Sequence, residues 1–232
     1  MEKTIRNQGE IMKIFLDTAD VSEIKRCWST GLIDGITTNP SLIRKSGRNH
    51  EDVYQEIKDI GLKDISMEVI GSTVNMVSEG KRLHKKFGKC CTVKVPCTRD
   101  GLRACAELSV EGIRVNVTLV FSTAQAVLSS KAGAKYISPF VGRLDDISFD
   151  GVGLVKDIAS LYREQMVTTE VLAASLRDVR SVGKCFRYGA DIVTMPTKVF
   201  DGMYEHVLTD KGMDIFDKDY AKSIEGLEIT AV

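Results

Sequence analysis

Short apolar segments rich in β-branched residues recur along the chain, and segments with helical periodicity separate them. The pattern predicts strands near residues 13–18, 34–39, 64–70, 91–97, 114–119, 136–141, 169–175 and 191–196. It predicts helices between them, near residues 21–30, 50–60, 73–87, 100–110, 122–131, 151–164, 178–188 and 198–208. Such alternation is typical of parallel βαβ units.

Strand–helix units that fill about 200 residues without a long linker favour a single closed (β/α)8 barrel, which we expect to span residues 13–232. An open doubly wound sheet is the alternative. A further helix is expected near residues 214–225, packed across the barrel or onto a neighbouring chain. Residues 1–11 are polar and aperiodic, so residues 1–12 are expected to form a flexible extension, with Met12 as an alternative start.

Polar residues interrupt the predicted strands, although both faces of a strand are covered in a parallel barrel and should be apolar. The interruptions keep the two-residue period of a strand, so they share one face. The residues on this face are Asp17, Glu68, Lys94, Asn116 with Thr118, Ser138 with Phe140, and Ala173 with Ser175. They predict a common inward site near the C-terminal ends of the strands, with errors in strand register as the alternative.

Lys94 stands in the middle of the predicted buried strand at residues 91–97. An unpaired buried ammonium is unfavourable, so this amine must be paired or lose its proton. A neutral amine in an apolar pocket is a nucleophile toward carbonyl carbon, which makes Lys94 a candidate for a Schiff-base lysine. A lysine that faces solvent at a sheet edge is the alternative from this segment alone.

A ketone that reacts with a lysine needs proton transfers during carbinolamine formation and dehydration. Glu68 is placed to supply them through a water that Thr118 holds. Asp17 is placed to take a proton from a substrate hydroxyl during carbon–carbon cleavage. Asn39 and Asn116 can orient hydroxyls without adding charge.

Structural roles are open as alternatives for several of these residues. Asp17 would cap the helix that begins near Ala19. Glu68 would serve as the structural partner of Lys94, a role compatible with proton transfer. Residues 37–39 would form a turn before a proline.

A phosphate site is suggested after the sixth and seventh strands. Ser175 and Arg177 follow the seventh strand, where barrels often bind phosphate, and Arg143 follows the sixth. The planar guanidinium can donate two parallel hydrogen bonds to phosphate. Salt bridges to nearby acids are the alternative, and the acids within reach are Asp145, Asp146 and Asp178.

The composition narrows the function further. Lysine plus arginine total 32 and aspartate plus glutamate total 32, so no net charge favours nucleic acid or an anionic membrane. No segment approaches the roughly 18 apolar residues of a membrane span. The 6 cysteines show no metal-type spacing with the 3 histidines and read as reduced thiols of a cytoplasmic protein. We therefore expect no metal and no cofactor.

Several segments in combination resemble the small transaldolases. They are FLDTA at 15–19, GITTNPS at 35–41, VKVP at 93–96, SPFVGRLD at 138–145 and LAASLR at 172–177. The resemblance runs from about residue 13 to 224 in consistent order. It implies a (β/α)8 barrel and a Schiff-base mechanism without metal. The implied reaction moves a dihydroxyacetone unit from sedoheptulose 7-phosphate to glyceraldehyde 3-phosphate, yielding erythrose 4-phosphate and fructose 6-phosphate, in the pentose phosphate pathway.

The resemblance also implies a role for each matching residue. Lys94 would be the nucleophile, Asp17 and Glu68 would transfer protons, and Thr118 would hold the catalytic water. The residues expected to contact the sugar and its phosphate are Asn39, Asn116, Ser138, Phe140, Arg143, Ser175 and Arg177. Small members of the family typically form fivefold rings with C-terminal helices that reach a neighbour, and stacking of the rings is left open.

The related fructose-6-phosphate aldolases are the alternative reading. They carry glutamine where Glu68 stands and tyrosine where Phe140 stands. A phenolic hydroxyl near the enamine can protonate it and release free dihydroxyacetone, whereas a phenylalanine cannot. Both positions therefore favour transaldolase.

Overall fold

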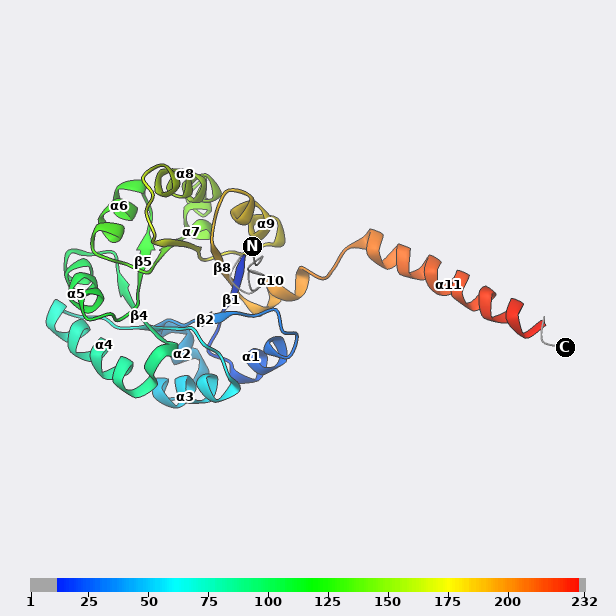
Figure 1. Ribbon diagram of the computed structural model, residues 1–232, viewed down its shortest axis with the longest axis horizontal. Helices are drawn as coiled ribbons and strands as arrows, with labels where there is room; N and C mark the ends of the chain where they lie inside the picture. Colours follow the sequence, from blue (N-terminus) through cyan, green and yellow to red (C-terminus); the bar gives the residue numbers. More distant parts are fainter. Residues whose placement is uncertain (1–11, 230–232) are drawn as a thin grey trace, which may run out of the picture.

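The computed structural model describes residues 12–229 and shows a closed parallel barrel. The strands follow one another around the barrel in sequence order, and helices surround them (Figure 1). The strands are β1 (Lys13–Asp17), β2 (Gly35–Thr37), β3 (Ile65–Glu68), β4 (Cys91–Pro96), β5 (Val115–Val120), β6 (Tyr136–Pro139), β7 (Glu170–Ala173) and β8 (Ile192–Met195). The prediction of a (β/α)8 barrel is confirmed, and the open sheet is wrong because β1 pairs with β8.

Helices cover the outside of the barrel, and one helix leaves it. The covering helices are α1 (Val21–Trp28), α2 (Pro40–Ser46), α3 (His50–Ile60), α4 (Thr73–Phe87) with the short 3₁₀ helix η2 (Gly88–Cys90), α5 (Arg99–Val110), α6 (Thr123–Lys131), α7 (Val141–Asp145), α8 (Gly151–Glu164), α9 (Val179–Arg187) and α10 (Thr197–Gly202). The last helix, α11 (Val207–Ile229), projects away from the barrel (Figure 1).

The helices depart from the sequence prediction in three places. The sequence does not predict two short helices, α2 and α7, because the residues that begin α2 are equally typical of a turn before a proline and α7 begins directly after a strand. The helix expected over residues 198–208 ends at Gly202, where backbone bonds to the third preceding residue tighten the chain into turns. A new helix then begins at Val207, earlier than the predicted 214. Apart from Met12, the expected N-terminal extension lies outside the described residues.

Polar caps begin most of the covering helices. Asp20 accepts hydrogen bonds from the backbone N–H groups of Ser22 and Glu23 at the start of α1. Asn39 accepts from the N–H of Leu42, and Pro40 follows as the first residue of α2. The cap of α1 is therefore Asp20, and the alternative in which Asp17 caps this helix is wrong.

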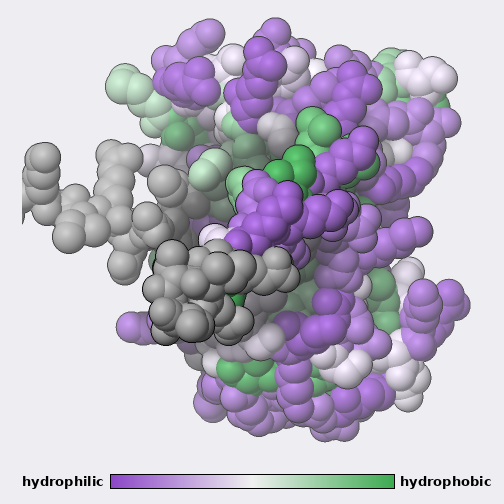
Figure 2. Space-filling view, turned by 90° about the vertical axis from the view of Figure 1, so that its right-hand side faces the viewer, coloured by the Kyte–Doolittle hydropathy of each residue, from purple (hydrophilic) through white to green (hydrophobic). Residues whose placement is uncertain are grey.

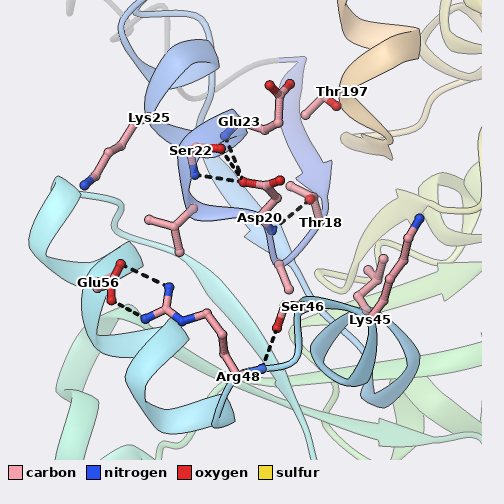
Figure 3. A pocket seen from close by; sticks show the side chains of 13 residues that line it. Thr18, Asp20, Ser22, Glu23, Lys25, Lys45, Ser46, Arg48, Glu56 and Thr197 are labelled. Carbon is pink, nitrogen blue, oxygen red and sulfur yellow. Dashed lines mark hydrogen bonds and ion pairs between the residues drawn. The ribbon is translucent and has the colours of Figure 1, made fainter.

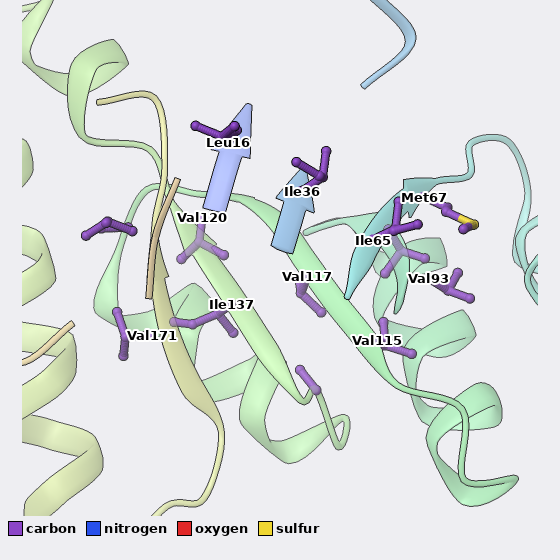
Figure 4. Packing of buried hydrophobic residues seen from close by; sticks show 14 of the residues in the cluster. Leu16, Ile36, Ile65, Met67, Val93, Val115, Val117, Val120, Ile137 and Val171 are labelled. Atoms are coloured by element: carbon purple, nitrogen blue, oxygen red, sulfur yellow. The ribbon is translucent and has the colours of Figure 1, made fainter. Parts of the chain in front are cut away.

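The apolar core has two layers. Outward-facing strand residues pack against the helices in a layer that includes Leu16, Ile36, Ile65, Met67, Val93, Val115, Val117, Ile137 and Val171 (Figure 4). A smaller cluster fills the barrel itself and consists of Phe15, Tyr136, Leu172, Ala174 and Ile192. A Cβ atom on residue 35 would lie 2.6 Å from the ring of Phe15, so glycine is required there. Both layers exclude water from the strands.

The seventh strand departs from the predicted alternation by one residue. Leu172 and Ala174 belong to the cluster inside the barrel, whereas Ala173 packs in the outer layer. The expectation that Ala173 faces inward with Ser175 is therefore wrong. Residues on this strand are apolar on both faces, so the sequence offers no contrast from which to read its register.

A charged network closes the N-terminal end of the barrel. Asp64, just before β3, accepts hydrogen bonds from Thr92 (2.8 Å), the hydroxyl of Tyr136 (2.7 Å) and the guanidinium of Arg114 (2.9 Å). Burial raises the pKa of the Asp64 carboxyl, and Arg114 acts in the opposite direction. These bonds tie β3, β4, β5 and β6 together at the end opposite the predicted site.

We expect Asp64→Ala to lower the free energy of unfolding by about 2–4 kcal/mol, because two buried hydroxyls and the partly exposed guanidinium of Arg114 lose their acceptor. Urea unfolding followed by circular dichroism measures this loss. Lys81→Ala is the control, since its pair with Glu111 is exposed and should contribute little. Equal losses for the two variants would contradict a structural role of the network.

Candidate active site

Three polar side chains lie in one row across adjacent strands. Glu68 of β3 stands in register with Lys94 of β4, and Lys94 stands in register with Asn116 of β5. Because register partners on parallel strands point to the same face, all three enter the barrel interior. Two residues further along the same strands, Pro96 stands in register with Thr118. The row lies in the half of the barrel toward the C-terminal strand ends.

Lys94 is buried and paired. Its side chain lies with Nζ 2.9 Å from Oε2 of Glu68, and Nζ donates a hydrogen bond of 2.9 Å to the carbonyl oxygen of Thr38. Only 4% of Lys94 is exposed, so the alternative of a solvent-facing lysine is wrong. Glu68 is its structural partner, as the sequence analysis left open, and it is also close enough to exchange a proton with the amine directly.

Asp17 lies at the C-terminal end of β1, opposite Thr37 of β2. Its Oδ1 accepts a hydrogen bond of 2.8 Å from the hydroxyl of Thr37. Burial raises the pKa of the Asp17 carboxyl above its ordinary value, while the charge of Lys94 and the Thr37 hydrogen bond oppose the change. Asp17 thus takes up a proton more readily than an exposed aspartate would.

Hydrogen bonds fix both the nitrogen and the oxygen of the Asn116 side-chain amide. Its amide nitrogen donates to the hydroxyl of Ser66 (3.1 Å), and its amide oxygen accepts from the hydroxyl of Ser138 (2.8 Å). The hydroxyl oxygen of Thr118 is buried and has no hydrogen-bond partner among the described residues. Since buried hydroxyls are normally bonded to protein or to water, Thr118 has capacity to hold one small polar molecule.

These side chains meet in a cavity of about 100 Å³ at the C-terminal end of the barrel. The residues that line it are Asp17, Thr37, Asn39, Lys94, Thr118, Ser138, Phe140, Arg143, Ala174 and Ser175. Glu68 is paired with Lys94, and Asn116 accepts a hydrogen bond from Ser138, so both contact residues that line the cavity. The structure therefore brings ten of the eleven sequence-predicted site residues into one cluster.

A cationic corner forms one wall of the cavity. The guanidinium of Arg143 lies over the ring of Phe140, 4.9 Å from its centroid, and Phe121 packs edge-on against the same ring. The N–H of Gly142 donates to the carbonyl oxygen of Ser175 (3.1 Å), which brings α7 against the end of β7. Ser175 has φ of 60°, and this left-handed conformation lets its side chain line the cavity despite the shifted alternation of β7.

Arg177 is the predicted site residue that does not line the cavity. It forms an ion pair with Asp146, which lowers the pKa of that carboxyl. This salt bridge is the alternative that the sequence analysis left open. A Cβ atom on Gly142 would lie 2.8 Å from Nε of Arg177, so the Arg177 side chain passes directly beside the α7 turn that carries Arg143.

Sequence reasoning missed three hydroxyl residues around the cluster: Thr37, Ser66 and Thr194. Thr37 binds both Asp17 and Thr194, and Ser66 binds Asn116. The signal was present, because each stands on the same alternating face as a predicted site residue or between two apolar neighbours. A single serine or threonine is common in strands, so by itself it does not indicate a functional position.

A larger hollow of about 630 Å³ lies beside the barrel, where the start of α1 faces the end of α2. Figure 3 shows Asp20, Ser22 and Glu23 on one side and the ion pair of Arg48 with Glu56 on the other. It contains none of the predicted site residues. The predicted site residues are therefore concentrated in the smaller cavity.

Two searches of the described part of the chain bear on ligands and membranes. Among residues 12–229, no three His, Cys, Asp or Glu side chains are grouped so that they could hold a metal ion. None of the helices described is both long and apolar enough to cross a membrane.

Comparison with known proteins gives one consistent result. Residues 14–231 match the family model described as Transaldolase/Fructose-6-phosphate aldolase. A "Probable transaldolase" of Cereibacter sphaeroides (strain ATCC 17025 / ATH 2.4.3) is 51% identical over 213 residues, which cover 91% of this chain and 97% of that protein. Proteins of the same name from Paracoccus denitrificans and Nitrosopumilus maritimus are also 51% identical and cover 91% of this chain, with 98% and 96% of their own lengths matched.

We expect Glu68→Ala to lower the free energy of unfolding by about 3 kcal/mol, because it leaves the Lys94 ammonium buried without its counter-charge. Adding Lys94→Met to this variant should recover most of the loss, since no buried charge then remains. Urea unfolding of the two single variants and the double variant measures the coupling. Strictly additive effects would show that the pair does not act as a unit.

Proposed function

Because the chain belongs to the transaldolase/fructose-6-phosphate aldolase family, we propose that Lys94 forms the Schiff base that carries a dihydroxyacetone unit between sugar phosphates. The protein is a transaldolase, an enzyme of carbohydrate metabolism whose substrates are sugar phosphates. The observation that carries the proposal is a buried lysine, 2.9 Å from a carboxylate, in a polar cavity at the C-terminal end of the barrel.

The proposed donor is sedoheptulose 7-phosphate and the proposed acceptor is glyceraldehyde 3-phosphate, within the pentose phosphate pathway. Lys94 first passes a proton to Glu68, and the free amine attacks the C2 carbonyl of the ketose. Glu68 then returns protons as the carbinolamine loses water, through a water held by the hydroxyl of Thr118. The 2.9 Å ion pair and the unpartnered Thr118 hydroxyl support these two roles.

Asp17 acts in the carbon–carbon step. It accepts the proton of the C4 hydroxyl while the electron pair of the C3–C4 bond moves into the iminium group. Erythrose 4-phosphate leaves as an aldehyde, and the dihydroxyacetone enamine stays on Lys94. A carboxyl whose pKa is raised by burial is suited to take up this proton and return it when the acceptor adds.

The enamine has to survive until the acceptor arrives. Phe140 stands at the cavity wall and carries no hydroxyl, so it cannot protonate the enamine carbon. Its ring also supports the guanidinium of Arg143. This favours transfer to an aldehyde over release of free dihydroxyacetone.

The remaining predicted residues bind the substrate. Asn39, Asn116 and Ser138 contact the sugar hydroxyls, and their neutrality leaves the charge balance around Lys94 unchanged. The phosphate binds the cationic corner at Arg143 and Ser175, and Arg177 joins them by exchanging Asp146 for the phosphate. The approach of Arg177 to the turn that carries Arg143 supports this assignment.

We expect borohydride treatment in the presence of fructose 6-phosphate to leave a dihydroxyacetone-derived adduct on the peptide that contains Lys94. Mass analysis of the digest locates it, and Lys94→Ala should keep its fold while losing both the adduct and turnover by several orders of magnitude. An adduct on another lysine, or near-normal turnover of Lys94→Ala, would refute the assignment. Fructose 6-phosphate alone should yield little free dihydroxyacetone, whereas substantial release would favour the aldolase alternative.

We also propose that the protein forms a homo-oligomer, as a fivefold ring in which α11 reaches a neighbour. The helix projects from the barrel and exposes large apolar side chains, which are Val207, Leu208, Met213, Ile215, Phe216 and Tyr220. Figure 2 looks onto the side from which α11 projects and shows hydrophobic side chains between hydrophilic ones. Exposed apolar surface of this kind is typical of an interface. A cytoplasmic location is proposed as well, supported by the six free cysteines.

If α11 mediates assembly, Phe216→Asp combined with Tyr220→Asp should shift the protein from a multi-chain particle to smaller species. The added charges would be buried at the interface. Light scattering coupled to size-exclusion chromatography measures the mass, and Asp217→Ala is the control on the same helix. A monomeric wild-type protein at micromolar concentration would contradict the proposal.

A further inference from the structure

A chain of two buried hydroxyls leads away from Asp17. The hydroxyl of Thr37 donates to Oδ1 of Asp17 at 2.8 Å and lies 2.7 Å from the hydroxyl of Thr194. Both threonines are 2% exposed. The three residues come from β1, β2 and β8, and β8 lies beside β1 only because the barrel closes.

The direction of these hydrogen bonds follows from counting protons. A threonine hydroxyl has one proton to donate. An ionised carboxylate only accepts, so Thr37 gives its proton to Asp17. Thr194 must then donate to the oxygen of Thr37, and both hydroxyl dipoles point toward the carboxylate.

We propose that Thr194 is a positioning residue for the carbon–carbon step, because its hydroxyl fixes Thr37 and thereby the orientation of the Asp17 carboxylate. The inference rests on the proposed role of Asp17 as the proton acceptor. Oδ1 already accepts a hydrogen bond from Thr37, so we assign the C4 hydroxyl proton to Oδ2, which accepts none among the hydrogen bonds described. The same oxygen returns the proton when the acceptor aldehyde adds.

Thr194 is uncharged, whereas several ionisable groups surround Asp17. The ionisable groups that act on Asp17 are Lys94 of β4, Glu68 of β3 and Arg143 of α7. None of them contacts the threonine pair among the hydrogen bonds described. Loss of the Thr194 hydroxyl should therefore alter Asp17 through geometry and hydrogen bonding, while the charges stay in place.

Thr194→Val removes the hydroxyl and keeps the shape of the side chain. We expect kcat to fall about tenfold with little change in KM, since general acid–base groups contribute through the transition state. The acidic limb of the kcat profile should move to higher pH, because a carboxylate with weaker hydrogen bonding holds its proton more strongly. Thr194→Ser should restore both values. Thr194→Ala replaces the valine variant if that variant does not fold.

Thr92→Val is the matched control, since it also removes one hydroxyl from a buried threonine on the inner face but at the opposite end of the barrel. It should leave the pH profile unchanged. A Thr194→Val enzyme with the kcat and profile of the wild type would overturn the inference, as would an equal change in Thr92→Val.

The borohydride adduct separates this inference from the proposed function. Thr194→Val should still form the adduct on Lys94, while the first-turnover release of glyceraldehyde 3-phosphate from fructose 6-phosphate slows. If the wild type forms no adduct on Lys94, the Schiff-base proposal fails. If wild type and variant form it and release aldehyde at the same rate, only the role of Thr194 fails.

Discussion

A lysine ammonium inside a closed barrel must have a counter-charge, and this requirement explains the arrangement of side chains near the C-terminal ends of the strands. Lys94 is paired with Glu68 of β3 and donates to the carbonyl oxygen of Thr38, the residue after β2, so two other segments compensate its charge. The pair exists because β3 and β4 place the two residues in register. A carboxylate that stabilises the ammonium by this geometry also stands ready to remove its proton.

The two ends of the barrel interior contain different polar groups. Asp64 collects hydrogen bonds from Thr92, Tyr136 and Arg114 at the N-terminal end, where the network holds strands together. The Lys94 site lies toward the other end, and an apolar cluster that includes Phe15 and Leu172 also fills the barrel interior. Because the described residues of the two regions share no side-chain hydrogen bond or ion pair, substitutions in one should have limited effect on the other.

Within the site, the charged and the neutral side chains have different proposed roles. In the proposed mechanism Lys94, Glu68 and Asp17 exchange protons, whereas amides and hydroxyls orient the substrate without changing the charge around Lys94. Arg143 is held on the face of Phe140, and the left-handed conformation of Ser175 brings its side chain to the same wall. Lys94, Arg143 and Ser175 thus line one cavity, as the proposed binding of a phosphorylated sugar requires.

The sequence determined the strand–helix alternation, and with it the barrel, and it also determined which polar side chains turn inward. Side-chain alternation is a local property of each strand, so Asp17, Glu68, Lys94 and Asn116 could be identified without knowing their neighbours. Alternation did not give the register of β7, where both faces are apolar. Helical periodicity did not predict α2 and α7, which are too short to show a period. Only the tertiary structure decided the partners: the Arg177 pair with Asp146, the contact between Thr37 and Thr194, and the course of α11. Thr37 and Thr194 meet only because β8 closes against β1. All three features depend on where segments distant in the sequence lie in the folded molecule, and no local pattern records that placement.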